Sequence, residues 1–223
     1  MNLDTLSQIR EGGILYILLL IAITMHEFGH AYLADKFGDR LPRLQGRVSL
    51  NPLVHIDTMG SVVLPILTIT LSMGAGLPLV FGWGKPVELM LDNPKTRTKV
   101  DLLSTAGGVA MNLVVAFISA LLAALFYTLS MPELQRVAVQ SVYLNSVLFV
   151  LNMLPIPPLD GSRFLKYAIK MSDYTYYSIA RYGILILLVI INVPFTSKLF
   201  TFLVGFVANI FLASASILAT LIN

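Results

Sequence analysis

The chain has 223 residues, of which 57% are hydrophobic and 12% are charged, with a formal net charge of +3. Soluble domains carry about 25% charged residues, so this composition excludes an ordinary soluble domain and predicts an integral membrane protein in a lipid bilayer. Cysteine is absent, which excludes disulfides, a thiol nucleophile and thiolate metal ligands. Nothing in the sequence indicates a nucleic-acid partner.

Six apolar segments follow one another along the chain. They lie at about 13–34, 59–80, 100–129, 137–154, 180–195 and 199–221. A membrane span needs about 20 apolar residues, and most of these segments are long enough. We therefore expect an all-α polytopic membrane protein whose residues 1–223 form a single membrane-embedded domain.

The first segment ends in a cluster of ionisable residues. Residues 14–25 carry no charge, and His26, Glu27 and His30 follow without a break, so we expect no cleavable signal peptide. A charge at the bilayer centre costs roughly 2.5–3.5 kcal/mol or more, and a bound metal ion would offset that cost. Positions i and i+4 share one helix face, so the two histidines can bind one ion. Glu27 is turned by about 100° and can reach water at the metal as general base.

The second segment is broken by glycine and proline at 74–78, which favours a re-entrant segment over a full crossing. The residues at 81–89 (FGWGKPVEL) predict a short β-like hairpin. If 59–80 crossed the membrane, the 15 Lys and Arg residues would divide at best 9 against 6. A re-entrant segment divides them 12 against 3, which fits the positive-inside rule better. We expect five full spans plus the re-entrant segment, with the N-terminus outside and the C-terminus inside.

The third ligand is expected in the stretch 151–161 (LNMLPIPPLDG). Catalytic zinc usually takes three protein ligands, and the first segment supplies only two. Three prolines end the preceding helix, so Asp160 can turn back toward the bundle. The alternative is a loop that leaves the membrane, with Asp160 capping the next helix. Asp160 and the histidines can share a metal only if an even number of crossings separates them, which again favours the re-entrant segment.

These motifs resemble the site-2 protease family of intramembrane zinc metalloproteases. HEFGH followed by NMLPIPPLDG carries the resemblance, and SLNPLVHID (49–57), FGWGKPV (81–87) and STAGGVAMN (104–112) extend it. The likeness is closest to the small members that lack PDZ and CBS domains. It implies a catalytic core at about 13–163, followed by a C-terminal helical pair at about 180–221.

The resemblance also implies the composition of the active site. His26, His30 and Asp160 would bind one Zn²⁺ ion per chain, and Glu27 would be the catalytic base. The enzyme would be a zinc metalloendopeptidase of the HExxH type.

Three further polar residues match positions near the active site in this family. Asn112 and Asn152 would hold the substrate backbone or the oxyanion, and the alternative for each is an interhelical hydrogen bond. His55 is a candidate gating residue, and its alternative is a structural role at an interface.

The expected reaction is hydrolysis of a peptide bond within or next to a transmembrane helix of a membrane protein, as in regulated intramembrane proteolysis. That helix must unwind, and the 81–89 segment offers an edge on which it can pair. The expected location is a prokaryotic cell membrane, with the active site nearer the cytoplasmic face. The alternatives are a membrane metal or ion transporter and an inactive protease-like binding protein; a transporter would need the ligands but not Glu27.

Overall fold

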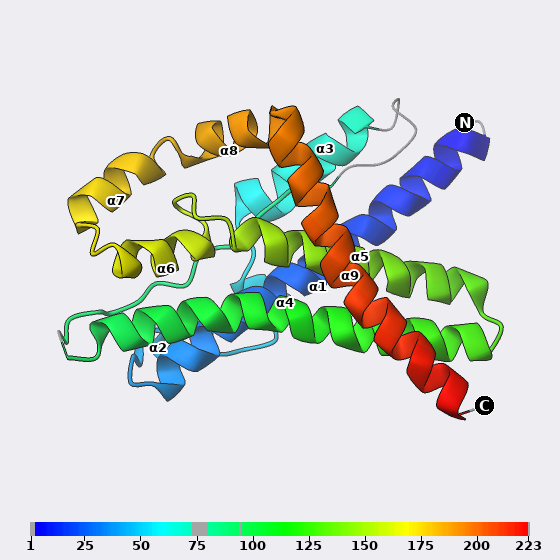
Figure 1. The fold of residues 1–223 in the computed structure, drawn as a ribbon, viewed down its shortest axis with the longest axis horizontal. Coiled ribbons are helices and arrows are strands. Elements are labelled where there is room, and N and C mark those ends of the chain that lie inside the picture. Colours follow the sequence, from blue (N-terminus) through cyan, green and yellow to red (C-terminus); the bar gives the residue numbers. More distant parts are fainter. Residues whose placement is uncertain (1–2, 73–79, 94, 223) are drawn as a thin grey trace.

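The computed structural model describes residues 3–72, 80–93 and 95–222, and this part of the chain forms helices and no strands (Figure 1). In chain order the elements are α1 (Leu3–Lys36), α2 (Leu41–Leu44), the 3₁₀ turn η1 (Pro52–Val54), the π-helical turn η2 (Thr58–Val63), α3 (Leu64–Ser72), α4 (Arg97–Thr128), α5 (Pro132–Asn152), α6 (Asp160–Ala168), α7 (Asp173–Ala180), α8 (Gly183–Asn192) and α9 (Pro194–Ile222).

Helices α1, α4 and α5 form the core of the bundle, and α9 crosses α4 and α5 obliquely (Figure 1). Small residues permit the close approach of α1 and α4. A Cβ atom on Gly29 would lie 2.3 Å from the carbonyl oxygen of Gly107, so the two backbones are in direct contact. Glycine contacts of this kind are common between membrane helices. This contact fixes the part of α1 that carries the histidines.

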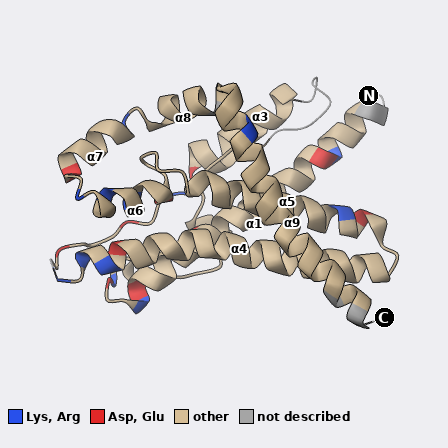
Figure 2. Ribbon diagram, viewed as in Figure 1, with Lys and Arg blue, Asp and Glu red and all other residues tan. Residues whose placement is uncertain are grey.

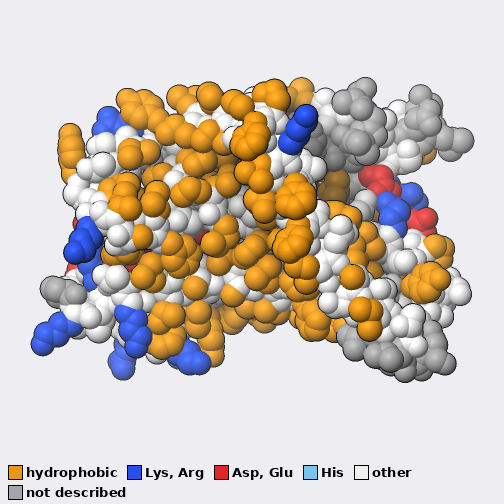
Figure 3. Space-filling view, in the orientation of Figure 1, with side chains coloured by type: hydrophobic (Ala, Val, Ile, Leu, Met, Phe, Trp, Pro, Cys, Tyr) orange, Lys and Arg blue, Asp and Glu red, His pale blue; other side chains and the backbone are white. Residues whose placement is uncertain are grey.

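Four helices of the described residues are long and apolar enough to cross a membrane. They are Thr5–Lys36, Arg97–Thr128, Pro132–Asn152 and Pro194–Ile217. Hydrophobic side chains cover the face of the molecule drawn in Figure 3, including α8 and α9. Most Lys and Arg residues gather at the end of the bundle where α4 begins (Figure 2). The chain is therefore an all-α integral membrane protein.

The span expected at 180–195 does not form one helix long enough to cross a membrane. Helix α8 has only ten residues, which gives a length of about 15 Å against the roughly 30 Å of a bilayer core. It ends because Pro194, the first residue of α9, holds Val193 in an extended conformation. The described helices thus supply four candidate crossings rather than five. An even number of crossings would bring both termini to one side, and α1 begins and α9 ends toward the same end of the bundle (Figure 1).

In the second apolar segment the structure describes a helical part that is shorter than a membrane crossing, and the glycines and proline at 74–78 lie outside the described residues. This helical part, Thr58–Ser72, has 15 residues and measures about 22 Å. From Val80 onward the chain runs back toward the end where α4 begins (Figure 1). We call residues 80–89 the strap.

The predicted hairpin at 81–89 is not formed. The strap is irregular and pairs with loops instead of with another strand: Trp83 N–H donates to Gly60 O at 3.0 Å and Lys85 N–H donates to His55 O at 2.8 Å. A second strand is missing because the chain beyond the strap continues to α4. The strap is therefore a single extended segment laid over η2 and the loop before it.

Candidate metal centre

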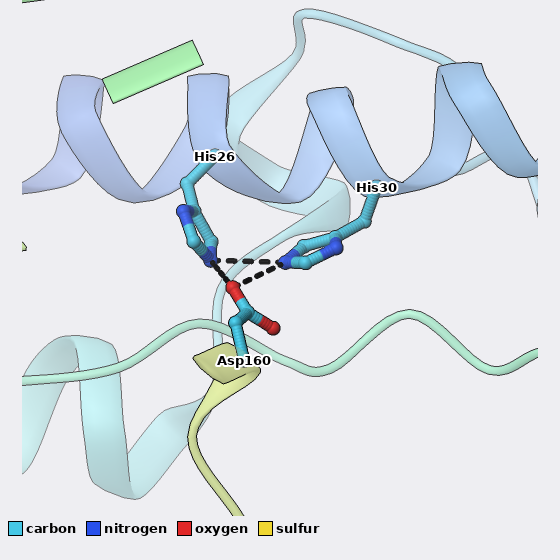
Figure 4. A group of neighbouring side chains, drawn as sticks. All are labelled: His26, His30 and Asp160. Carbon is cyan, nitrogen blue, oxygen red and sulfur yellow. Dashed lines mark hydrogen bonds and ion pairs between the residues drawn. The ribbon is translucent and has the colours of Figure 1, made fainter. Parts of the chain in front are cut away.

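Helix α1 presents His26 and His30 on one face, one turn apart. Their Nε2 atoms are 3.0 Å apart and their rings meet edge to face. Asp160 comes from the first residue of α6, after the turn that follows α5 (Figure 4). Gly161 permits that tight return, because a Cβ atom there would lie 2.2 Å from the carbonyl oxygen of Met153. The chain thus brings a carboxylate to two imidazoles that lie 134 and 130 positions earlier in the sequence.

The three side chains converge on one point (Figure 4). Asp160 Oδ2 lies 3.2 Å from His26 Nε2 and 3.3 Å from His30 Nε2. Ligand atoms about 2.0–2.1 Å from a tetrahedral zinc ion are roughly 3.3 Å from one another, so these distances fit a shared ion. Asp160 Oδ2 is buried and accepts no hydrogen bond from the described residues. Three protein ligands leave the fourth position of a catalytic zinc site open.

Both imidazoles are oriented by acceptors on α4. His26 Nδ1–H donates to Asn112 Oδ1 at 2.7 Å, and His30 Nδ1–H donates to the carbonyl oxygen of Ser104 at 2.9 Å. With the proton on Nδ1, each Nε2 carries a lone pair toward the other ligands. Such partners fix the tautomer and the ring orientation of metal-binding histidines. Two facing lone pairs and a carboxylate oxygen repel one another without a cation, so this donor set fits a metal ion.

Glu27 lies beside the ligands in a buried environment. Its Oε2 atom is 3.7 Å from Nη2 of Arg47, whose side chain is only 4% exposed. The Arg47 guanidinium also donates to the carbonyl oxygens of Val54 and Lys85. Burial lowers the pKa of Arg47, and the charge of Glu27 opposes that shift. On the strap, a Cβ atom on Gly84 would lie 2.9 Å from Glu27 Cγ, so the strap passes directly against the carboxylate.

The other residues singled out in the sequence have these positions. Asn112 is fully buried, and its Nδ2 donates to Asn145 Oδ1 while Oδ1 accepts from His26. Asn152 donates to Leu148 O, one turn earlier on α5, and has no hydrogen bond to the three ligands. His55 is buried in the loop under the strap, where its Nε2–H donates to Ser49 O. Burial lowers the pKa of His55. The structure thus brings Asn112 to the site, whereas His55 lies outside the ligand cluster.

The sequence motifs do not single out Arg47 or Asp101, although both are almost completely buried. Gly108 faces His30, where a Cβ atom would lie 2.2 Å from Nε2. Gly108 lies within the matching stretch STAGGVAMN, whereas Arg47 and Asp101 lie two and three residues before matching stretches.

Comparison with known proteins identifies the family. The chain is 33% identical over 191 residues to a Bacillus subtilis (strain 168) protein named "Putative zinc metalloprotease YwhC", and the match covers 82% of each chain. The chain belongs to the site-2 protease family. Two proteins named "Putative zinc metalloprotease Rip2", from Mycolicibacterium smegmatis and Mycobacterium tuberculosis H37Rv, are 32% and 31% identical to this chain. These matches cover 88% and 71% of this chain, and 74% and 59% of the relatives. No family model and no solved structure matches.

Membership in the site-2 protease family confirms the resemblance that the sequence motifs indicated. The match to the B. subtilis relative covers most of both chains, so the likeness extends well beyond the HEFGH motif.

Proposed function

We propose that this site-2 protease family member is an intramembrane zinc metalloendopeptidase that hydrolyses a peptide bond within or next to a transmembrane helix. One observation carries the proposal: His26 Nε2 and His30 Nε2 on the candidate span α1 form a triangle with Asp160 Oδ2 from α6, with edges of 3.0–3.3 Å. The names of the relatives support zinc as the metal. We propose that one ion binds at this triangle.

Each side chain at the site has a distinct task in this reaction. Zinc, when bound, supplies a Lewis acid that polarises the scissile carbonyl and lowers the pKa of water toward about 7. Glu27 takes the proton from the attacking water and later delivers it to the leaving amine, because it is the carboxylate next to the ligands that is not itself a ligand. Arg47 fixes the position of Glu27 from one side and Gly84 leaves room for it on the other.

The strap provides the surface for an unwound substrate strand. On one edge, Trp83 and Lys85 are bonded through both N–H and C=O to Gly60, Ser61, His55 and Arg47. On the other edge, the backbone groups of Gly82 and Gly84 have no hydrogen-bond partner among the described residues. An extended peptide can add to such an open edge, and Gly84 would bring it alongside Glu27.

The amides take different roles from each other. Asn112 uses both ends of its amide within the bundle, which supports a role in orienting His26. Asn152 keeps a second amide hydrogen and remains the proposed donor to the substrate or the oxyanion. His55 remains a candidate gating residue because its backbone carbonyl accepts a hydrogen bond from Lys85 of the strap.

We propose a re-entrant course for Thr58–Ser72 together with the strap, in a prokaryotic cell membrane. The charged end of the bundle faces the cytoplasm, which places the N-terminus outside and the active site nearer the cytoplasmic face. Four crossings would put the C-terminus on the same side as the N-terminus, and we propose this arrangement in place of the inside position expected from the sequence.

Replacement of Glu27 by Gln tests the function. We expect Glu27→Gln to keep zinc and the fold but to lose proteolysis, because the amide cannot accept the proton. The substrate is found by quantitative mass spectrometry of membrane fractions from cells that express either form. Peptides ending within transmembrane segments should appear with the natural protein and be absent with the variant.

The matched control is Glu133→Gln, which makes the same change at a side chain that is 71% exposed and far from the ligands. Its fragment pattern should equal that of the natural protein. Identical fragments in cells with Glu27→Gln would refute the protease proposal. Zinc uptake into proteoliposomes that persists in Glu27→Gln, without any proteolysis by the natural protein, would favour a transporter instead.

A further inference from the structure

Asp101 joins the start of α4 to α6 in a buried polar contact. Its side chain is 1% exposed. Oδ1 is paired with Nη1 of Arg163, and Oδ2 accepts a hydrogen bond of 2.6 Å from Tyr167 Oη. A buried carboxylate is costly unless it is paired and hydrogen-bonded, and here both oxygens have donors. Both donors belong to α6.

The contact acts on the helix that begins with a metal ligand. Asp160, Arg163 and Tyr167 are spaced three and four residues apart, so they share one face of α6. By binding two residues of this face, Asp101 fixes both the rotation of α6 and its position along α4. The carboxylate of Asp160 is thereby held at the first turn of the same face.

Helix α4 orients the other two ligands as well. Asp101, Ser104, Gly108 and Asn112 follow one another at intervals of three, four and four residues, which places them on one face of α4. Asn112 and Ser104 accept from the two histidines, and Gly108 leaves room for the ring of His30. The face of α4 that contains Asp101 therefore sets the positions of all three ligands.

We propose that Asp101 is a positioning residue of the metal centre, which acts through Arg163 and Tyr167 to hold Asp160 against the two histidines. The inference rests on the proposed zinc site and adds to it a determinant of metal affinity outside the ligands.

Zinc affinity of the purified full chain tests the inference. We expect Asp101→Asn to weaken zinc binding about 10- to 100-fold in competition with a chelator, as is typical when partners of metal ligands are removed. The visible absorption of the Co²⁺-loaded protein should also change, since the coordination geometry shifts. The control Asp35→Asn breaks a carboxylate–arginine pair with Arg43 that does not touch α6, and zinc affinity should stay unchanged.

Two further variants keep the test decisive. Tyr167→Phe removes one hydrogen bond with little change of volume, and we expect a smaller loss of affinity, of about two- to tenfold. It decides the question if Asp101→Asn does not fold. In the double variant Asp101→Asn with Arg163→Gln, zinc affinity should be no lower than in whichever single variant binds zinc more weakly. The reason is that both substitutions remove the same contact between Asp101 and Arg163.

The outcomes separate this inference from the proposed function. Natural affinity and an unchanged Co²⁺ spectrum in folded Asp101→Asn, or in Tyr167→Phe where the former does not fold, would overturn the positioning role. Fully additive losses in the double variant would overturn the route through Arg163. If the natural protein itself binds no zinc, the proposed metalloprotease function fails first.

Discussion

Gly108 on α4 faces the ligand nitrogen of His30 and has no side chain of its own. A Cβ atom at this position would lie 2.2 Å from Nε2 and 2.5 Å from Cε1 of the imidazole. The ring cannot move away freely, because the hydrogen bond from Nδ1 to Ser104 O holds it on α4. The absence of one methyl group is thus a condition for His30 to face Asp160.

We expect Gly108→Ala to displace the ring of His30 and to weaken zinc binding by about tenfold or more, in line with changes that misorient metal ligands. Chelator competition on the purified protein measures the affinity. The control is Gly205→Ala on α9, where an added Cβ atom meets nothing within 4 Å. That variant should bind zinc normally. Equal zinc affinity in the two variants would show that the ring of His30 has room to adjust.

The candidate ligands could be predicted from the sequence because each has a local cause. The histidines share a helix face by their spacing, and the prolines before Asp160 end a helix. Arg47 and Asp101 have no such cause. The partners of Asp101 lie 62 and 66 positions away, and Arg47 is buried only because the strap and the His55 loop close over it. Burial of that kind depends on tertiary contacts that a charge count does not contain.

At the scale of elements, the strap depends on Arg47 for its attachment. The planar guanidinium reaches the carbonyl oxygens of both Val54 and Lys85, and so joins the loop before η2 to the strap. A lysine ammonium is a compact charge and does not reproduce this two-pronged geometry. Arg47 is therefore expected to control the order of the strap, and not the affinity for metal.

We expect Arg47→Lys to leave zinc binding within about twofold and to speed amide hydrogen exchange at Trp83 and Lys85, whose N–H groups bond to the loops. Hydrogen–deuterium exchange with mass spectrometry of peptides that cover the strap measures this. Arg43→Lys is the matched control, since Arg43 is exposed and pairs with Asp35. Unchanged exchange in Arg47→Lys would mean that other contacts hold the strap.

Two elements could not be predicted correctly, for different reasons. In the strap, Gly82 and Gly84 were interpreted as turn residues, yet neither has a positive φ. A side chain at Gly82 would collide with the carbonyl oxygen of Gly60, and one at Gly84 would collide with Glu27. Only the folded chain reveals these contacts. The apolar run at 180–195 has the composition of a span, but Pro194 divides it from α9. The apolar segments at 13–34, 100–129, 137–154 and 199–221 contain no proline and lie almost entirely within long helices.

At the scale of the whole molecule, the number of crossings decides where the C-terminus lies. Five spans would place the termini on opposite sides, whereas crossings by the four long apolar helices of the described residues alone would place them on one side. The charge distribution agrees with the structure, since α4 begins at the basic end of the bundle and the loop after it lies at the other end (Figure 2). The candidate ligands are unaffected, because α4 and α5 are the two candidate crossings of the described residues between the HEFGH motif and Asp160.

Single cysteines can test this topology, because the natural chain contains none. A membrane-impermeant maleimide applied to intact cells should label Met131→Cys, between α4 and α5, and Thr220→Cys, near the end of α9. Lys95→Cys, just before α4, should react only after the membrane is opened. Unchanged zinc binding by each purified variant serves as the control for folding. If the chain had five spans, Thr220→Cys would react only after the membrane is opened, as Lys95→Cys does. That result would mean that the α7–α8 region crosses the bilayer despite the short length of its helices.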